Sequence, residues 1–283
     1  MFLAYNKKIM KADLHNHSYF SDGVLSPSEL VRLASDAGCD LFSLTDHDTT
    51  NGIFEAKLES DKLGLKLVSG VEISAFWRSS AIHIIGLGID IDNDELQTGL
   101  EFNQTLREER AKKIALGLWR SGIKDALEKA QEISGGHMLT RTHFAQMLIQ
   151  EGYCKDMKSV FRRYLTGRKP GGVRVEWKNF DTVIKWIQSS GGKALIAHPF
   201  RYRMTHTKIK NMLIDFKEAN GDGFEVINAN SSDQEISLGS QWIEEYDLLA
   251  SVGSDFHGWP NQRVQIGNLV DLPNNSRAIW SYL

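Results

Sequence analysis

Short apolar runs alternate with amphipathic stretches along most of the chain, and this alternation limits the folds that the sequence can adopt. Capping signals mark the stretches between the runs, such as Ser26-Pro27-Ser28-Glu29, a capping box with proline at the first helical position. Seven runs have the length of buried strands: Lys11–Leu14, Asp40–Leu44, Lys66–Ser69, Ala81–Leu87, Lys193–Ala197, Gly223–Ile227 and Leu248–Val252. The predicted helices extend from Ser26 to Gly38 and over Asn51–Leu63, Thr182–Ser190 (capped by Asp181), Thr207–Ala219 and Asp233–Tyr246. This pattern predicts parallel pairing, in a barrel or an open sheet.

The segment from residue 99 to residue 176 interrupts the alternation. It offers no strand, and its predicted helices are Leu100–Arg120, Lys124–Ile133, Thr142–Gln150 and Lys158–Leu165. We interpret 99–176 as a helical insertion in a discontinuous domain made of residues 1–98 and 177–283. Residues 101–180 contain 16 Lys and Arg against 9 Asp and Glu, although the whole chain has a net charge of −3. This surplus indicates either an ordinary solvated helical surface or a lobe that receives an anionic substrate.

Composition excludes several classes of protein. With 283 residues and 41% hydrophobic residues, the chain can fill the core of one barrel or of two domains. Its two cysteines, Cys39 and Cys154, lie far apart, which excludes a disulfide scaffold, a zinc ribbon and a thioredoxin-type site. No apolar run reaches the roughly 18 residues of a membrane helix, and the N-terminus has no signal-peptide core. We therefore expect a cytoplasmic protein with no membrane partner and no obligate protein partner.

Residues that bind metals collect where the predicted strands end. His15-Asn16-His17, Thr45-Asp46-His47-Asp48 and Ser254-Asp255-Phe256-His257 each follow a strand. Six of the nine histidines occupy such places, and alternate residues of an extended segment point to one face. Taken singly, each has an ordinary explanation: His83 can fill a barrel interior, and Asp22 can belong to a simple turn. Taken together, they predict a metal site at the mouth of a barrel.

These motifs resemble the polymerase and histidinol phosphatase (PHP) family. The resemblance is carried by Asp13-Leu14-His15-Asn16-His17, Ser21-Asp22-Gly23, Thr45-Asp46-His47-Asp48, Gly70-Val71-Glu72, Ala197-His198-Pro199 and Gly253-Ser254-Asp255-Phe256-His257. It implies a distorted seven-stranded β/α barrel with an inserted small helical domain. The insertion, Leu139-Thr140-Arg141-Thr142-His143 and His198-Pro199-Phe200-Arg201-Tyr202 resemble the subgroup of nucleoside 3′,5′-bisphosphate phosphatases and 5′-to-3′ exoribonucleases.

The resemblance also implies a ligand set for three divalent ions. The implied metal ligands are His15, His17, Asp22, His47, Glu72, His83, His198, Asp255 and His257. We group His15, His17, Glu72 and Asp255 on one ion, Glu72, His83 and His198 on a second, and Asp22, His47 and His257 on the third. Glu72 can bridge two ions because a carboxylate has two oxygens, whereas a neutral imidazole has one free lone pair. An N/O donor set without thiolate fits Mn²⁺, our first expectation, and also Fe²⁺ or Zn²⁺.

Such a cluster predicts phosphoester hydrolysis by in-line attack of metal-bound hydroxide, with Glu72, Asp255 and His257 as catalytic residues. We expect Arg141, His143, Arg201 and Arg168 to bind substrate, because Arg141 and His143 stand at a predicted helix N-terminus and Arg201 follows His198. The predicted substrate is a nucleoside 3′,5′-bisphosphate, which loses its 3′-phosphate, or a short 5′-phosphorylated RNA. The alternatives are a phosphatase for a smaller metabolite such as histidinol phosphate and a non-catalytic metal-binding module.

Overall fold

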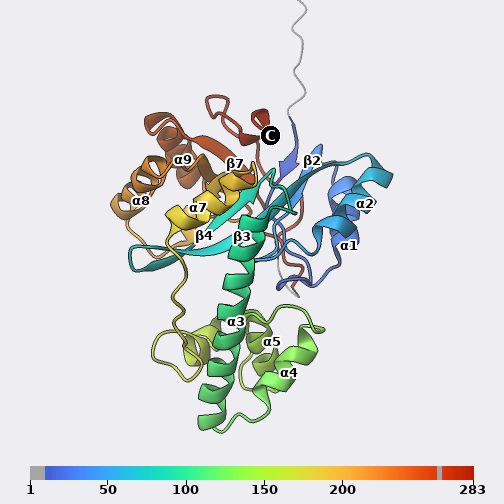
Figure 1. Ribbon diagram of the computed structural model, residues 1–283, viewed down its shortest axis with the longest axis vertical. Helices are drawn as coiled ribbons and strands as arrows, with labels where there is room; N and C mark the ends of the chain where they lie inside the picture. The colour runs from blue at the N-terminus through green and yellow to red at the C-terminus, as the bar shows by residue number, and fades with distance from the viewer. Residues whose placement is uncertain (1–9, 260–262) are drawn as a thin grey trace, which may run out of the picture.

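Seven strands curl into a nearly closed barrel (Figure 1). The computed structural model describes residues 10–259 and 263–283. The strands follow one another around the sheet in chain order. They are β1 (Ala12–Asp13), β2 (Leu41–Leu44), β3 (Lys66–Trp77), β4 (Ser80–Leu87), β5 (Lys193–Ile196), β6 (Gly223–Asn228) and β7 (Leu249–Gly253). The first and last strands approach each other, and just beyond β1 the Leu14 N–H donates a 3.0 Å hydrogen bond to the Val252 carbonyl of β7. The predicted seven-stranded β/α barrel is confirmed.

Helices cover the outside of the barrel. On one side lie α1 (Pro27–Asp36) and α2 (Ile53–Leu63), and on the other lie α7 (Phe180–Ser189), α8 (His206–Glu218) and α9 (Asp233–Glu245). The predicted capping box is confirmed, because Ser26 and Glu29 each accept a backbone N–H from the other. The predicted cap at Asp181 is wrong: α7 begins after Asn179, which places Asp181 inside the first turn. In the described part of the chain, no helix combines the length and apolar character needed to cross a membrane.

The strand β4 breaks the parallel arrangement. It pairs antiparallel with β3 from Gly70–Leu87 to Trp77–Ser80, and it is also antiparallel to β5. The prediction of parallel pairing is therefore wrong here, because a tight turn at Arg78 (φ +53°) joins β3 to β4 without a helix between them. The predicted end of β3 at Ser69 is wrong as well. Gly70 does not interrupt the strand; it makes room for β2, because a Cβ there would lie 2.4 Å from Ser43 Oγ.

A second hydrophobic core lies below the barrel in Figure 1. It is built from the C-terminal half of α3 (Asp94–Arg120), α4 (Ala126–Ile133), α5 (Arg141–Gln150), α6 (Met157–Val160) and a π-helical turn (Phe161–Leu165). The N-terminal half of α3 packs into the barrel core through Leu96 and Leu100, and Ile114 and Leu118 pack into the second core. Residue 99 therefore falls inside a helix that belongs to both cores. We call the part built around the second core the helical lobe.

Candidate active site

Loops and strands of the barrel bring the nine predicted metal ligands together. His15, His17 and Asp22 follow β1, His47 follows β2, Glu72 lies within β3, His83 within β4, His198 follows β5, and Asp255 and His257 follow β7. Seven of the nine are buried, and His47 and His83 are half-buried. A single mouth therefore collects side chains from six strands.

Glu72 is the centre of this group. Its two carboxylate oxygens lie 2.8–3.4 Å from a ring nitrogen of each of five histidines: His15, His17, His47, His83 and His198. Oε1 contacts His83 and His198, and Oε2 contacts the other three. A carboxylate that bridges two ions must direct one oxygen toward each of them, and the two oxygens of Glu72 do face different histidines.

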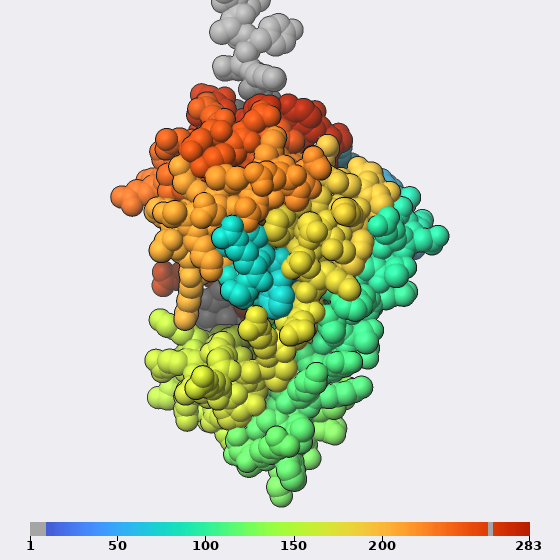
Figure 2. Space-filling view, turned by 60° about the vertical axis from the view of Figure 1, so that its left-hand side comes forward, coloured from blue at the N-terminus to red at the C-terminus, as the bar shows by residue number. Residues whose placement is uncertain are grey.

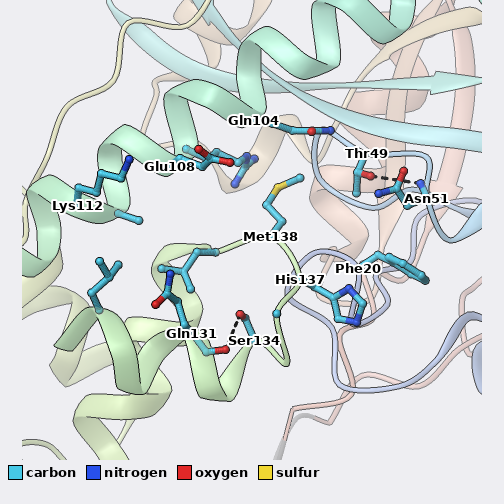
Figure 3. Close-up of a pocket in the computed structure, with 15 residues that line it drawn as sticks. Phe20, Thr49, Asn51, Gln104, Glu108, Lys112, Gln131, Ser134, His137 and Met138 are labelled. Carbon is cyan, nitrogen blue, oxygen red and sulfur yellow. Dashed lines mark hydrogen bonds between the residues drawn. The ribbon is translucent and has the colours of Figure 1, made fainter. Parts of the chain in front are cut away.

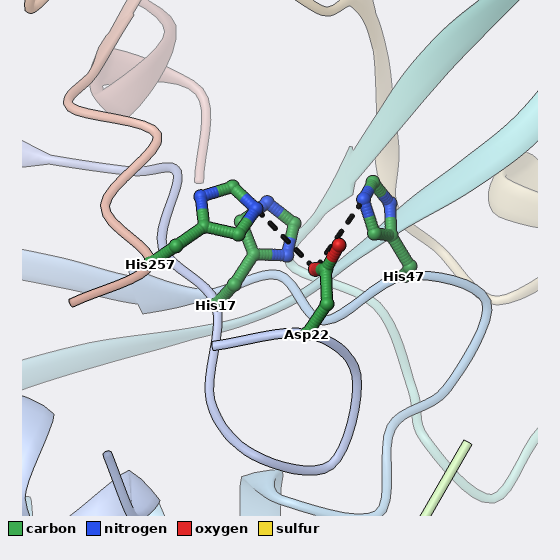
Figure 4. A group of neighbouring side chains, drawn as sticks. All are labelled: His17, Asp22, His47 and His257. Atoms are coloured by element: carbon green, nitrogen blue, oxygen red, sulfur yellow. Dashed lines mark ion pairs between the residues drawn. The ribbon is translucent and has the colours of Figure 1, made fainter. Parts of the chain in front are cut away.

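Asp255 and Asp22 extend the group on either side. Asp255 Oδ1 lies 3.4 Å from His15 Nε2 and 3.1 Å from His17 Nε2. Asp22 Oδ1 lies 3.3 Å from His257 Nε2 and 3.7 Å from His47 Nε2, and Figure 4 shows this carboxylate between the two rings. The other Asp22 oxygen accepts a 2.8 Å hydrogen bond from the Thr142 hydroxyl, so it joins the barrel to the start of α5.

The donor atoms fit divalent metal ions. His15 Nε2 and His17 Nε2 lie 3.0 Å apart, which is about the edge of an octahedron whose metal–nitrogen bonds are about 2.1 Å. Within the described residues, four buried ligand atoms form no hydrogen bond of suitable angle, even though His47 Nδ1 and Glu72 Oε2 lie 2.8 Å apart: Asp22 Oδ1, His47 Nδ1, Glu72 Oε2 and His198 Nδ1. Three groups have donor atoms within 4.8 Å of one another: His17, Asp22, His47 and His257; His15, His17 and Glu72; His47, Glu72 and His83. Buried polar atoms without partners are costly, and metal coordination would satisfy them.

The carboxylates and histidines strongly affect one another's protonation. Burial opposes protonation of His17, but the hydrogen bonds that its ring donates to Asp255 and Glu72 raise its pKa to about 10. For His47 burial prevails and lowers the pKa to about 4. The neighbouring histidines hold the pKa values of Glu72, Asp22 and Asp255 well below the usual range in spite of their burial. All three carboxylates are therefore ionised, as metal ligands must be.

Buried acidic groups hold the ligands in position, and the sequence analysis assigned them no role. Glu225 in β6 accepts from His15 Nδ1 at 2.9 Å and from the His198 N–H at 2.6 Å. Because Nδ1 of His15 is used in this bond, its Nε2 faces Glu72 and Asp255. Asp46 accepts from the hydroxyls of Ser18 and Ser21, which fixes the loop that carries Asp22. A charged residue inside the apolar run Gly223–Ile227 is the signal that points to Glu225.

A buried ion pair ties the helical lobe to the barrel. Asp48, the residue after His47, accepts from Arg107 Nε of α3 at 2.6 Å and from Asn103 Nδ2 at 2.7 Å. The Arg107 guanidinium also donates to Ser74 Oγ at 2.8 Å. Asp48 is fully buried, and Arg107 is 7% exposed. This network fixes α3 against β3 and the His47 loop.

A cavity of about 420 Å³ lies between the barrel mouth and the helical lobe. On the barrel side, its lining includes Asp22, His47, Glu72, His83, His198, Asp255 and His257. On the lobe side, it is lined by Arg107, Arg110 and Arg141. Phe76, Phe161, Arg174 and Trp177 are also among the lining residues. Figure 2 shows that the turn between β3 and β4, in cyan, and the yellow-green part of the lobe lie next to each other on one face.

Two half-buried arginines, Arg110 and Arg141, line this cavity together with the exposed Arg174. Within the described ranges, neither Arg110 nor Arg141 forms an ion pair. Arg110 is half-buried, and its buried Nε has no hydrogen-bond partner. Burial, together with Arg141 and Arg107, lowers the pKa of Arg110 well below its usual value. Since guanidinium groups stay charged, a bound anion would relieve this repulsion. The three-residue spacing of Arg107 and Arg110 on one helix was the missed signal.

The other predicted substrate-binding residues lie in different surroundings. His143 is buried, and its Nδ1 accepts the Thr140 N–H at 3.1 Å, so it caps α5 and is absent from the cavity lining. Arg201 donates to Asp255 Oδ2 and, at 3.2 Å, to Asn228 Oδ1. Arg168 is exposed in the loop after the π-helical turn and does not line the cavity. Of the four, only Arg141 lines the cavity.

A second cavity, of about 490 Å³, lies between α3, α4 and two barrel loops. Figure 3 shows Gln104, Glu108 and Lys112 of α3 on one side of it, with Phe20 and His137 close together at one end. Arg107 lines both cavities, but none of the nine predicted metal ligands lines this one.

Known proteins are similar in sequence to this chain over almost its whole length. Residues 13–226 match the family model of the PHP domain. A Haemophilus influenzae protein named 5′-3′ exoribonuclease is 39% identical over 273 residues, which cover 95% of this chain and 98% of that protein. A Chromobacterium violaceum protein named 3′,5′-nucleoside bisphosphate phosphatase is 39% identical over 272 residues, 96% of this chain and 95% of that protein.

A solved structure agrees in fold. It is described as an amidohydrolase from Chromobacterium violaceum with bound sulfate and no metal, and it superimposes with a TM-score of 0.90 at 38% identity. The match covers 96% of this chain and 95% of that one. The family model and these relatives show that the chain belongs to the PHP domain family, in agreement with its barrel and its histidine and carboxylate motifs.

Proposed function

We propose that this chain is a metal-dependent phosphoric ester hydrolase that removes the 3′-phosphate of nucleoside 3′,5′-bisphosphates and shortens 5′-phosphorylated RNA from its 5′ end. One observation carries the proposal: a single cavity of about 420 Å³ has candidate metal ligands on one wall and, on the other, the half-buried Arg110 and Arg141, which form no ion pair within the described residues. Such a cavity suits a small ligand with two phosphates. The names of two relatives, a bisphosphate phosphatase and an exoribonuclease, support the same substrate class.

The barrel wall would supply the chemistry. The nine ligands around Glu72 would hold three divalent ions, with Mn²⁺ as the proposed metal and Glu72, Asp255 and His257 as the catalytic residues. Divalent ions bound there would stabilise the negative charge of the phosphate and lower the pKa of a coordinated water. Glu225 holds His15 with Nε2 toward the cluster, and Asp46 holds the Asp22 loop, so hydrogen bonds of the protein orient these ligands.

The lobe wall would select the substrate. We propose that residues 99–176 act as a substrate-recognition insertion, in which Arg110 and Arg141 bind the phosphate that is not cleaved. An arginine can donate two parallel hydrogen bonds to a phosphate, which fixes its orientation. Phe161 and Trp177 would contact the nucleoside and exclude water. A bisphosphate and a 5′-phosphorylated RNA both present a terminal 5′-phosphate beside a second phosphoester, so one cavity would serve both.

A comparison of three substrates tests the proposal against a phosphatase for a smaller metabolite. The Mn²⁺-loaded protein is incubated with adenosine 3′,5′-bisphosphate, a 5′-phosphorylated dinucleotide and histidinol phosphate. We expect phosphate from the first, mononucleotide from the second, and slow turnover of the third, because it leaves both arginines unpaired. Release of phosphate from histidinol phosphate alone would contradict the proposal. No turnover by a protein that retains its metal would favour a binding module.

A further inference from the structure

The segment Met157–Val175, which we call the basic segment, combines high positive charge with a place beside the cavity. It contains six cations and no acidic residue: Lys158, Arg162, Arg163, Arg168, Lys169 and Arg174. All six are exposed. Counting only the residues that the structure describes, none of the six forms an ion pair. An exposed cluster of cations that are not held in ion pairs attracts polyanions.

The segment also forms part of the cavity wall. Phe161 near its start and Val173, Arg174 and Val175 at its end line the cavity that holds the candidate metal ligands. In Figure 2 this yellow-green to yellow part of the chain borders the same face as the cyan turn between β3 and β4. A chain that leaves the cavity on this side would pass over the exposed cations.

The backbone of the segment is held in place. The Gly171 N–H donates to the Tyr164 carbonyl at 2.7 Å, and the Gly172 N–H donates to the Lys169 carbonyl at 2.8 Å. These bonds fold the loop back on the π-helical turn. The loop also packs closely on α3, since a Cβ at Gly117 would lie 1.8 Å from the Pro170 carbonyl oxygen. The cations therefore project from a fixed base.

We propose that the basic segment binds the phosphates of a single-stranded RNA downstream of the nucleotide held in the cavity. This inference rests on the proposed function and extends it, because a cavity of about 420 Å³ suits one nucleotide-sized ligand and a longer substrate must continue outside. Arg168, predicted to bind substrate but exposed outside the cavity, acquires a role here. RNA binding of this kind depends on charge and weakly on sequence.

Two quadruple variants with the same change in charge test this proposal. The first, K158Q/R162Q/R168Q/K169Q, removes the four cations of the segment that neither line the cavity nor donate a side-chain hydrogen bond among residues 10–259 and 263–283. The control, K57Q/K62Q/K66Q/K185Q, removes four exposed lysines of α2, β3 and α7 that do not line the cavity. Each lowers the formal net charge by four, so a general repulsion of RNA affects both equally.

The substrates are a 5′-phosphorylated adenosine pentanucleotide and adenosine 3′,5′-bisphosphate. We expect the first variant to lower kcat/KM for the pentanucleotide by roughly tenfold, through KM, and to leave the bisphosphate within about twofold. The slope of log kcat/KM against log salt should become less steep by about 0.7 for each lost phosphate contact. Equal losses on both substrates, or an equal loss in the control variant, would overturn the proposal.

A binding measurement separates this inference from the proposed function. If the wild-type protein hydrolyses neither substrate, the proposed function fails, but fluorescence anisotropy with a labelled pentanucleotide still reports whether the segment binds RNA. Unchanged anisotropy titrations for the first variant would refute the RNA surface. Sedimentation with phosphatidylserine vesicles gives a further check: binding lost in the variant while pentanucleotide binding is kept would assign the surface to a membrane instead.

Discussion

The two walls of the cavity differ in how their charges are balanced. On the barrel wall, carboxylates and histidines contact one another at hydrogen-bond distances, and buried residues such as Glu225 orient them from behind. On the lobe wall, Arg110 and Arg141 have neither acidic partners nor such support within the described residues. A wall rich in donor atoms suits cations, whereas a wall of unpaired cations suits an anion.

This difference assigns separate tasks to the two parts of the chain. The barrel would determine whether a phosphoester is cleaved, and the lobe would determine which phosphoester is presented. Changes in the barrel wall should then affect all substrates equally. Changes in the lobe wall should affect only substrates that carry a second phosphate.

The largest effect is expected for Glu72→Gln. Its carboxylate contacts five histidines, so loss of one charged oxygen disturbs more than one ion, and kcat should fall by about 10³-fold or more on every substrate. Steady-state kinetics with metal analysis checks this, and Glu59→Gln, a buried glutamate of α2, is the matched control. Near-normal kcat with full metal content would contradict the central role of Glu72.

Asp48→Asn should cost about 3 kcal/mol of unfolding free energy, because Arg107 would remain buried without its partner. Denaturant unfolding measures this, and Asp61→Asn, which breaks an exposed pair with Lys57, should cost under about 1 kcal/mol. We also expect a selective rise in KM for bisphosphates, since Arg107 fixes α3 against the barrel. An unchanged midpoint would show that the pair does not hold the two parts together.

Arg110→Met should weaken the use of the second phosphate. We expect kcat/KM for adenosine 3′,5′-bisphosphate to fall roughly 30-fold, which corresponds to about 2 kcal/mol of transition-state stabilisation. The value for adenosine 3′-phosphate should change little. Arg32→Met, which removes an exposed arginine paired with Glu59, serves as the control. Equal losses on the two nucleotides would place Arg110 outside the phosphate subsite.

Metal affinity should rise with pH. His17 of the metal-free protein has its pKa raised to about 10, so a metal ion must displace its proton at neutral pH. Affinity should increase by about tenfold per pH unit between pH 7 and pH 8 for each displaced proton. In the metal-free protein, the same raised pKa contributes stability below about pH 6.5, and this contribution is lost as the pH rises through about 10. Metal titrations at pH 7 and pH 8 test this prediction, and an affinity that does not change with pH would contradict it.

Much of the barrel could be predicted from local patterns. Apolar runs, the Ser26–Glu29 capping box and the glycine at position 64 act within a few residues, so they located the strands and most helix ends. The direction of β4 could not be predicted in this way, because it depends on a turn at Arg78 that carries no glycine or proline signal. The predicted end of β3 failed for a related reason: Gly70 serves its neighbour β2 and does not end the strand.

The residues of the candidate site likewise fall into those that local motifs predict and those that depend on tertiary packing. The nine predicted ligands meet around Glu72, because motifs at strand ends become neighbours once a barrel closes. The lobe residues depend on how α3 packs, and no local pattern specifies that packing. Arg110 was therefore missed, and His143, expected to bind substrate, caps α5 and does not line the cavity.

Because α3 runs without interruption from one core into the other, its residue count sets the distance between the two walls. Each residue of an α-helix adds about 1.5 Å and turns the chain by about 100°. Removal of a single residue between Asn103 and Arg110 would swing the arginine away from the cavity while both cores kept their own packing. The length of α3 would therefore set the distance between the two phosphates that the proposed substrate can have.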